Sequence, residues 1–445
     1  MTGRNIASWL ADRKKISDLH VEFIEFNKSE QWHFTPDKKK LVHKSGKFFT
    51  IEGLVSESTY PGFGKQYQPI INQPEIGILG IVFKKAADDQ LLLMQAKAEP
   101  GNINTVQLAP TLQATKSNYT RVHGGKQQEY FELLENSQKK LVYDTLQSEQ
   151  GTMFFRKRNR NILLELNTDE ELEPLAAFRW LSYRQILPLL KKDNLVNSDA
   201  RSVLAVYFLN YGVSLFGKKE LNKFQRELLK SLQQKSTESG FVWIKKLRRK
   251  YKLQAKLSPL NKLPGWTIGN DKITNKLNKT LEVRQIRVKI QGREVTNWDQ
   301  PIVLTSQKGI LVLLTKKING TLCFLLNEVM EPGIWGDIEI TGSIQTNNNN
   351  LHDENNLQTR LYKKYVIEKT NSQKFLEVEN SEEGGRFYHD VNKYIFIRLN
   401  DTEELDLPET YFWATLAQLK EFINKDTILT NELRSQLAIL FSQFS

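Results

Sequence analysis

The stretches IGILGIVFKKAADDQLLLMQAKA (residues 76–98) and GILVLLTKKINGTLCFLLNEVM (residues 309–330) decide the fold of this chain. Each consists of two short apolar runs on either side of a turn, which is the pattern of a β-hairpin. The first turn is Ala86-Ala87-Asp88-Asp89, and the second contains Asn319-Gly320, a dipeptide that strongly favours hairpins. The chain therefore contains the same predicted hairpin twice.

The two hairpins belong to a much longer internal repeat. Matching residues recur at a separation of 232 to 234 positions over nearly 200 residues: Trp9 and Trp243, Pro69 and Pro301, Glu99 and Glu331, Gln113 and Gln345, Trp180 and Trp413, and Arg201 and Arg434. A register that drifts so little indicates a duplicated domain. We place the first copy at residues 1–222 and the second copy at residues 223–445.

Each copy has its strand-like runs first and its helix-like runs last. Residues 198–212 (SDARSVLAVYFLNYG) have helical periodicity, and Ser198 is a suitable N-cap for that helix. A second amphipathic stretch, residues 222–235, bridges the two copies. The pattern predicts a mixed class (α/β, more closely α+β) with two tandem domains, each a curved mixed sheet flanked by helices.

The composition excludes several classes of protein. With 39% apolar and 26% charged residues, the chain has the composition of a globular protein. No apolar run reaches the roughly 18 residues that span a bilayer, and the first residues lack the apolar core of a secretion signal. The single cysteine, Cys323, rules out an internal disulfide, and the six histidines have no metal-binding spacing. We expect a soluble cytoplasmic protein without a metal or membrane partner.

The net charge of +12 raises the question of a nucleic-acid partner. The densest basic run is KKLRRK, residues 245–250, in a helix-like stretch. We interpret it as a solvated helix face rather than a nucleic-acid surface. Some of the positive charge elsewhere can serve a diphosphate ligand, because phosphates are bound by Arg and Lys donors.

Two segments contain most of the candidate site residues. In residues 95–123, strand alternation places Gln95, Lys97 and Glu99 on one face, which suits either a ligand cavity or an ordinary solvated sheet face. In residues 147–160, a carboxylate beside Gly is followed by aromatic and basic residues, and the second copy repeats this order. Such a segment can hold a nucleotide, or it can be a turn followed by a solvated strand. The chain has no Walker A loop, no G-x-S-x-G elbow and no dinucleotide fingerprint.

Several of these segments resemble the signature blocks of the NDP-hexose 2,3-dehydratases of deoxysugar biosynthesis. The matching blocks are INQPEIGILG (71–80), residues 95–125, QSEQGTMFFRKRNRN (147–161), FRWLSYRQI (178–186), NLVNSDARSVL (194–204) and SEEGGRFYH (381–389). The resemblance implies two fused Nudix-like domains and a homodimer. It also implies a carbon–oxygen lyase that acts on a dTDP-linked 4-keto-6-deoxyhexose and needs no cofactor. The acidic Nudix box is not present, so metal-assisted pyrophosphate hydrolysis is not expected.

The implied reaction is the loss of water across C2 and C3 of the sugar. The C4 ketone acidifies the C3 hydrogen, so that a base can remove it if donors stabilise the developing enolate. The C2 hydroxyl must be protonated as it leaves, and the resulting enol relaxes to a 3,4-diketone. A 3-ketoreductase is a possible downstream partner.

The resemblance suggests roles for residues of the first copy, although a structural role is open for each of them. The acid and base candidates are Glu99, Glu149, Tyr119 and His123. Residues that can polarise the ketone or hold sugar hydroxyls are Lys97, Asn102, Gln107, Gln113 and Asn118. The diphosphate candidates are Arg158, Arg160 and Arg179, with Trp180 as a stacking platform or, as for Trp413, a core residue.

The second copy departs from the pattern, because VQLAPTLQATKSNYTRVH in the first copy is replaced by IEITGSIQTNNNNLHD. A second pocket would still contain Glu331, Gln345, Glu382, Arg386, Tyr388 and His389. We infer that the first copy carries catalysis and that the second is a weakened nucleotide pocket or a scaffold. Two alternatives stay open: a nucleotide-sugar binding protein that has lost catalysis, and a nucleic-acid binder.

Overall fold

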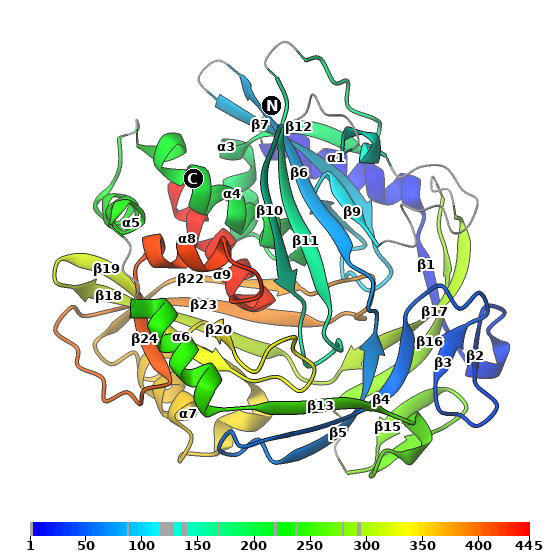
Figure 1. The fold of residues 1–445 in the computed structure, drawn as a ribbon. Helices are drawn as coiled ribbons and strands as arrows, with labels where there is room; N and C mark the ends of the chain where they lie inside the picture. Colours follow the sequence, from blue (N-terminus) through cyan, green and yellow to red (C-terminus); the bar gives the residue numbers. More distant parts are fainter. Residues whose placement is uncertain are drawn as a thin grey trace.

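The computed structural model of the chain has a mixed α+β fold built from two similar halves (Figure 1). It describes residues 3–86, 89–115, 129–134, 140–167, 170–217, 220–235, 239–277, 280–291 and 295–445. The predicted class and the two-copy organisation are confirmed. The division of the chain at residues 222 and 223 stays a prediction.

Each half contains one large sheet of seven strands. In the first half the order is β10-β11-β6-β7-β12, with β8 on β7 and β9 on β6. These strands are β6 (Gly77–Ala86), β7 (Asp89–Ala98), β8 (Val106–Ala109), β9 (Leu112–Ala114), β10 (Lys140–Ser148), β11 (Arg158–Glu165) and β12 (Phe178–Ser182). Strands β6 and β11 run parallel and the other pairs antiparallel, so the sheet is mixed as predicted.

The large sheet of the second half repeats this arrangement strand for strand. Its members are β18 (Gly309–Ile318), β19 (Thr321–Val329), β20 (Glu339–Thr341), β21 (Ile344–Asn347), β22 (Ser372–Ser381), β23 (Val391–Leu399) and β24 (Tyr411–Ala414). Both predicted hairpins form, as β6–β7 and β18–β19. Asn319 and Gly320 both have positive φ, at 49° and 75°, as a two-residue hairpin turn requires.

Two smaller sheets exchange strands between the halves. The first contains β2 (Trp32–Phe34), β3 (Leu41–His43), β4 (Thr50–Ser58) and β5 (Lys65–Asn72), and the second contains β14 (Trp266–Ile268), β15 (Lys272–Asn275), β16 (Leu281–Lys289) and β17 (Asn297–Thr305). Strand β13 (Leu253–Ser258) of the second half pairs with β4, and β1 (His20–Ile24) of the first half pairs with β16. Each half therefore completes a sheet of the other.

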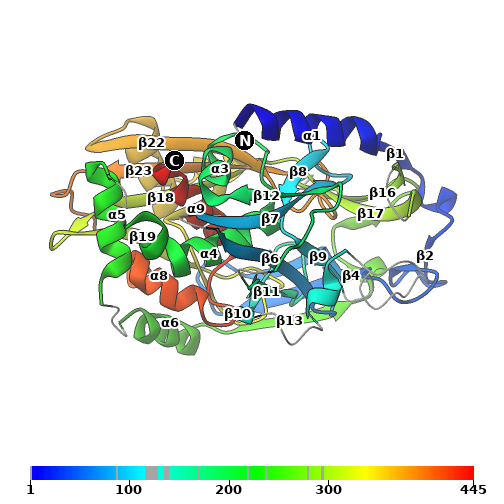
Figure 2. The same ribbon diagram turned by 90° about the horizontal axis from the view of Figure 1, so that it is seen from above.

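Two helices form the centre of the molecule, between the large sheets (Figures 1 and 2). They are α4 (Ser198–Phe216) and α9 (Asn431–Phe441), and they contact each other. Most of the residues of α4 are buried, because it is covered on all sides. Its N-cap is Asn197 and not the predicted Ser198, since the Asn197 side chain accepts a hydrogen bond from the Ala200 backbone N–H at 2.8 Å.

The remaining helices cover the outside of this core. They are α1 (Gly3–Ser17), α3 (Tyr183–Ile186), α5 (Lys223–Gln233), α6 (Ser239–Lys250), α7 (Leu357–Tyr362) and α8 (Leu416–Ile423). Helix α5 is the predicted bridge between the copies, and it contacts both α4 and α8. None of the helices in the described ranges is long and apolar enough to cross a membrane.

Candidate functional site

The end of β7 carries the central carboxylate of the candidate site. Glu99 accepts a hydrogen bond from Gln113 Nε2 at 2.8 Å, and Lys97 Nζ lies 4.0 Å from its Oε1. Lys97 also donates to the backbone carbonyl of Gln113 at 3.2 Å. Asn197 donates to Gln113 Oε1 at 3.1 Å, which ties this arrangement to the start of α4. A cation and an amide donor therefore both lie next to the Glu99 carboxyl group.

Two further titratable side chains lie deep in this region. Asp199 is 4% exposed, and its pKa is raised well above the usual value by burial and by the nearby Glu383, Glu149 and Glu99. Lys157 is also buried, and burial lowers its pKa, although Glu149, Glu383 and Glu75 oppose that shift. The interior of this half thus holds carboxyl and ammonium groups side by side.

The second half of the chain reaches into this region through the turn between β22 and β23. Gly101 N–H donates to the Gly384 carbonyl at 2.7 Å, and His389 N–H donates to the Gly101 carbonyl at 2.8 Å. A Cβ at Gly101 would overlap the carbonyl oxygen of Phe387, so this close approach requires glycine. The turn thereby places Glu383 next to the residues of the first half.

Glu383 is surrounded by charges of both signs. Burial raises its pKa to about 7, Arg386 and Lys157 oppose the shift, and Glu149 and Glu99 add to it. Arg386 is held in place by Phe49, whose ring centroid lies 4.4 Å from the guanidinium carbon, and by Gln73 Oε1 at 3.4 Å. We call the group of interacting polar residues around Glu99 the first-half cluster: Lys97, Glu99, Gln113, Lys157, Asp199 and Glu383.

The equivalent group of the second half, the second-half cluster, consists of Glu331, Glu339, Gln345 and Glu432. Gln345 Nε2 donates to Glu331 at 3.0 Å, and the Gly151 N–H of the first half donates to Glu331 at 2.6 Å. Burial raises the pKa values of Glu331 and Glu339 to about 7, and that of Glu432 well above the usual value. This cluster therefore favours neutral carboxyl groups.

The repeated Ser-Glu-x-Gly motif joins the two halves. The Glu149 carboxylate accepts hydrogen bonds from Asn159 and from Asn431 of the other half, both at 2.8 Å. Glu382 accepts in the same way from Asn392 at 2.8 Å and from Gln150 of the other half at 2.7 Å. Both oxygens of each carboxylate are thus engaged within the protein, which favours a structural role for Glu149 over the predicted acid or base role.

The other predicted residues of the first copy lie at different distances from Glu99. Asn102 is 3% exposed and follows Glu99 in the turn after β7. Gln107 is fully buried, and its amide donates to Asn104 and to Ser381 of the other half. Three predicted residues lie outside the described ones: Asn118, Tyr119 and His123.

The structure does not bring the predicted diphosphate residues together. Arg158 stacks on Trp335 at 3.5 Å, and Arg160 pairs with Asp144 at 2.6 Å. Arg179 is on β12 and lies over the ring of Trp9. The strands β6 and β7 lie between β12 and β11, which carries Arg158 and Arg160. Side chains two residues apart on a strand point to the same face of the sheet. Arg179 therefore shares a face with Leu181, which packs in the core cluster of α4, whereas Arg158 and Arg160 share the opposite face with Ile162.

Trp180 has the contacts of a structural residue rather than of a stacking platform. Its indole N–H donates to the Leu172 carbonyl at 2.9 Å, and Lys84 Nζ lies over its ring, 4.7 Å from the ring centroid. The side chain also packs on an apolar cluster. The stacking role stays a prediction without support from these contacts.

The residues predicted for a second-copy pocket are also divided. Glu331 and Gln345 are hydrogen-bonded to each other, whereas Arg386 lies next to Glu383 of the first-half cluster. Tyr388 packs edge-on against Phe23 at 4.8 Å, and His389 stacks on Tyr388 at 4.0 Å. Sequence reasoning assigned the whole SEEGGRFYH segment to its own copy, whereas the turn crosses to the other half.

Sequence reasoning missed Asp199, Lys157 and Glu383 as members of the site. All three lie inside the signature blocks, so their positions were visible in the sequence. Their joint placement follows from α4 and from the crossing turn, which no local pattern indicates. In the described part of the chain, no group of three or more His, Cys, Asp or Glu side chains is placed to hold a metal ion.

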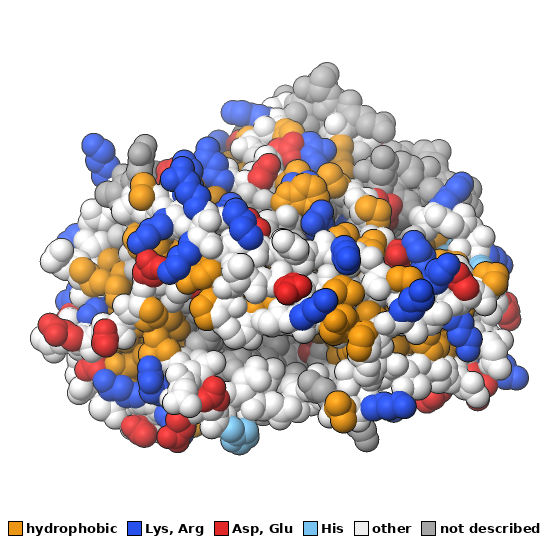
Figure 3. Space-filling model, turned by 60° about the horizontal axis from the view of Figure 1, so that its bottom comes forward, with side chains coloured by type: hydrophobic (Ala, Val, Ile, Leu, Met, Phe, Trp, Pro, Cys, Tyr) orange, Lys and Arg blue, Asp and Glu red, His pale blue; other side chains and the backbone are white. Residues whose placement is uncertain are grey.

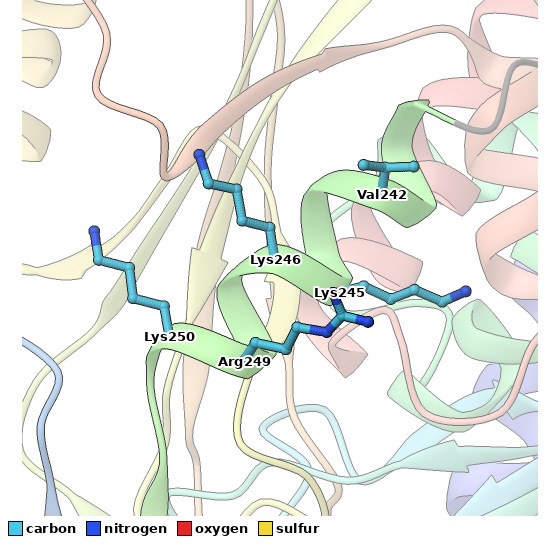
Figure 4. A pocket seen from close by; sticks show the side chains of 5 residues that line it. All are labelled: Val242, Lys245, Lys246, Arg249 and Lys250. Carbon is cyan, nitrogen blue, oxygen red and sulfur yellow. The ribbon is translucent and has the colours of Figure 1, made fainter.

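Four basic side chains of α6, Lys245, Lys246, Arg249 and Lys250, lie around a shallow hollow that one helix face lines (Figure 4). Arg248 is instead partly buried: it donates to the Ile338 carbonyl at 2.9 Å and interacts electrostatically with Glu339 of the second-half cluster. Lys246 and Lys250 extend to one side and form ion pairs with Glu409, while Lys245 and Arg249 extend to the other. On the face drawn in Figure 3, acidic and apolar side chains separate the basic groups. These features are typical of a solvated helix face.

Comparisons with known proteins place the chain in a family. Among solved structures it resembles a C. elegans Ap4A hydrolase (18% identity, 26% of this chain and 86% of that one, TM-score 0.20) and an ADP compounds hydrolase (14%, 40% and 94%, TM-score 0.25). It is 35% identical to a dTDP-4-dehydro-6-deoxy-alpha-D-glucopyranose 2,3-dehydratase of Saccharopolyspora spinosa, over 98% of this chain and 90% of that protein. A Streptomyces violaceoruber protein of the same name is 34% identical, over 97% and 95%. The sequence model of the NDP-hexose 2,3-dehydratases matches residues 3–207 and 237–440, one segment in each half, and the chain therefore belongs to the NDP-hexose 2,3-dehydratase family.

Proposed function

We propose that this protein removes water across C2 and C3 of dTDP-4-keto-6-deoxy-glucose, which yields a 3,4-diketo sugar. The relatives of the chain that are named dehydratases of this substrate match nearly their whole length to it. The observation that carries the proposal is a carboxylate, Glu99, held beside a cation and an amide donor in the first half. The elimination is redox-neutral, so it consumes no nicotinamide.

Glu99 is the proposed base that removes the C3 proton. Lys97 and Gln113 hold its side chain in place, so that a carboxylate oxygen can accept the proton. As the proton leaves, negative charge develops on the C4 oxygen, and the same lysine can stabilise this enolate. A positioned base contributes roughly 10²–10⁴-fold to the rate.

The proposed division of labour gives catalysis to the first copy, residues 1–222. The second copy, residues 223–445, is a scaffold or a weakened nucleotide pocket, because its cluster lacks the ammonium groups of the first. We further propose that the enzyme works in the cytoplasm as a homodimer and that a 3-ketoreductase consumes its product. Sedimentation of the purified protein at several concentrations tests the dimer.

The test of the function supplies the purified protein with the 4-keto sugar in heavy water, without NAD(P)H. We expect a diketone that an aromatic diamine traps, with deuterium at C2. Absence of the adduct, under conditions in which a related dehydratase forms it, would reject the proposal. Binding of dTDP without turnover would instead favour the alternative, a nucleotide-sugar binding protein that has lost catalysis.

A further inference from the structure

A corner between the two halves brings two carboxyl groups to the same point. The position that a Cβ would occupy at Gly385 lies 3.6 Å from Glu383 Oε1 and 3.9 Å from Glu99 Oε1. Glu99 comes from the end of β7, and Glu383 comes from the turn after β22 of the other half. Because residue 385 is glycine, it places no side chain of its own at this point.

The side chains at this corner differ in what they can contact. Glu383 and Gly385 keep an intermediate exposure, whereas Asp199 and Glu149 are each 4% exposed. Of these three carboxyl groups, Glu383 is therefore the most exposed. Nearby, Asn102 Oδ1 lies against Gly384 and has no hydrogen-bond partner among the described residues, although Asn102 is 3% exposed.

We propose that Glu383 of the second half is the general acid that protonates the departing C2 hydroxyl, opposite Glu99 of the first half. This inference rests on the proposed dehydratase function. It changes the proposed division of labour in one respect: the base stays in the first copy, while the second copy, otherwise a scaffold, supplies the acid.

The electrostatic surroundings suit the two groups to opposite tasks. Glu383 has a pKa raised to about 7 by burial, opposed by Arg386 and Lys157 and supported by Glu149 and Glu99. Asp199 faces it as a further carboxyl group. A substantial fraction of Glu383 therefore holds a proton at neutral pH, whereas Glu99 has the Lys97 ammonium and the Gln113 amide beside it. Two carboxyl groups separated in this way can act as an acid and a base.

The equivalent corner of the second half cannot do the same chemistry. At the offset of 233 residues, Glu383 corresponds to Gln150 and Gly385 corresponds to Thr152. Gln150 carries no acidic proton, and its amide donates to Glu382. Only one of the two equivalent corners therefore has an acid opposite its glutamate.

Glu99 takes the C3 hydrogen as a proton, and the electrons of the C3–H bond form the enolate of the C4 ketone. The enolate then re-forms the ketone, its electrons make the C2=C3 bond, and the C2–O bond breaks. The proton of Glu383 goes to the departing oxygen, which leaves as water, and the C2=C3 enol becomes the 3,4-diketone by proton transfer from O3 to C2.

The experiment compares Glu383→Gln with the wild-type protein, using the 4-keto sugar in heavy water. We measure two rates separately: exchange of the C3 hydrogen with solvent, and formation of the trapped diketone. If Glu383 is the acid, the variant still exchanges at C3 but forms the diketone roughly 10²–10³-fold more slowly. Glu383→Asp, which keeps an acid, is expected to regain part of the loss.

A matched control is Glu379→Gln on β22, because Glu379 pairs with Lys308 and is one-third exposed. It is expected to match the wild-type protein in both rates. Equal diketone formation by wild type and Glu383→Gln overturns the inference, and so does loss of exchange together with elimination in a variant that melts like the wild type. If the wild-type protein itself neither exchanges nor eliminates, it is the proposed function that fails.

Discussion

The first-half and second-half clusters occupy equivalent places in the duplicated fold, yet they differ in charge. Glu99 and Gln113 have the counterparts Glu331 and Gln345, and both pairs form the same hydrogen bond. The cations differ, since Lys97 corresponds to Val329 in the second copy. In the same way, Lys157 corresponds to Asp390 and Arg386 to Met153.

This difference teaches that burial alone does not make a base. Both Glu99 and Glu331 are 5% exposed, so desolvation acts on both. Glu331 lies among carboxyl groups and backbone donors, and its pKa rises to about 7. Glu99 instead has the Lys97 ammonium 4.0 Å from its Oε1. The retained cations, and not the retained glutamates, distinguish the catalytic copy.

The scaffold around the clusters is symmetric where the clusters are not. Arg201 donates to the carbonyls of Val196 and Ser381 and to Ser435 Oγ, and Arg434 donates to the carbonyls of Leu429 and Ser148 and to Ser202 Oγ. Both arginines are completely buried. Each binds its own half and the other half, so that the two copies hold each other in place.

Substitution of the two equivalent glutamates is expected to give the largest difference in activity between the halves. Glu99→Gln is expected to lower kcat roughly 10²–10⁴-fold, because it removes the proposed base. Glu331→Gln is expected to cost less than about tenfold, since its carboxyl group is held by the protein itself. Diketone formation by the two variants measures the contrast, and equal losses would contradict the assignment of catalysis to the first copy.

The symmetric scaffold predicts equal effects in the two halves. Arg201→Met and Arg434→Met should each destabilise the folded protein by about 3–5 kcal/mol, because each leaves buried acceptors without a donor. Urea unfolding followed by fluorescence gives both values. A large loss in only one of the variants would show that the halves do not support each other equally.

A substitution in the first copy can remove the cation that the second copy lacks. Lys97→Val copies Val329, and we expect it to lower kcat by on the order of 10²-fold, because the enolate loses a nearby positive charge. The substrate KM should change less, since the effect arises in the transition state. An unchanged kcat with a raised KM would assign Lys97 to substrate binding alone.

The neutral carboxyl groups of the second-half cluster predict a pH dependence of stability. The pKa of Glu339 in the folded protein is about 7, above its unfolded value, so the folded state binds more protons between these values. Its contribution is present at low pH and is lost as the pH rises through about 7. At pH 8, the free energy of unfolding of Glu339→Gln should therefore exceed that of the wild type by on the order of 1–3 kcal/mol. The two proteins should converge near pH 4, and a constant difference across this range would contradict the raised pKa.

Several features of the protein were predictable from its sequence. The constant offset of the repeats predicts the duplication, and Asn319-Gly320 predicts a hairpin turn that forms as expected. The long signature blocks indicate the family that the comparisons establish. Alternation along β7 places Lys97 and Glu99 on one face, while Ala96 and Ala98 enter the core on the other. These are local properties, set by residue types a few positions apart.

The sequence determined the duplicated units, the elements within them and the chemical groups that they carry. Only the tertiary structure decided that β1 and β13 each pair with a strand of the other half. It also placed Glu383 near Glu99. It also decided that Arg158 and Arg179 point to opposite faces of the sheet. The physical reason is that strand order and the crossing turn depend on contacts between residues hundreds of positions apart, and side-chain alternation along one strand contains no information about which strand lies beside it.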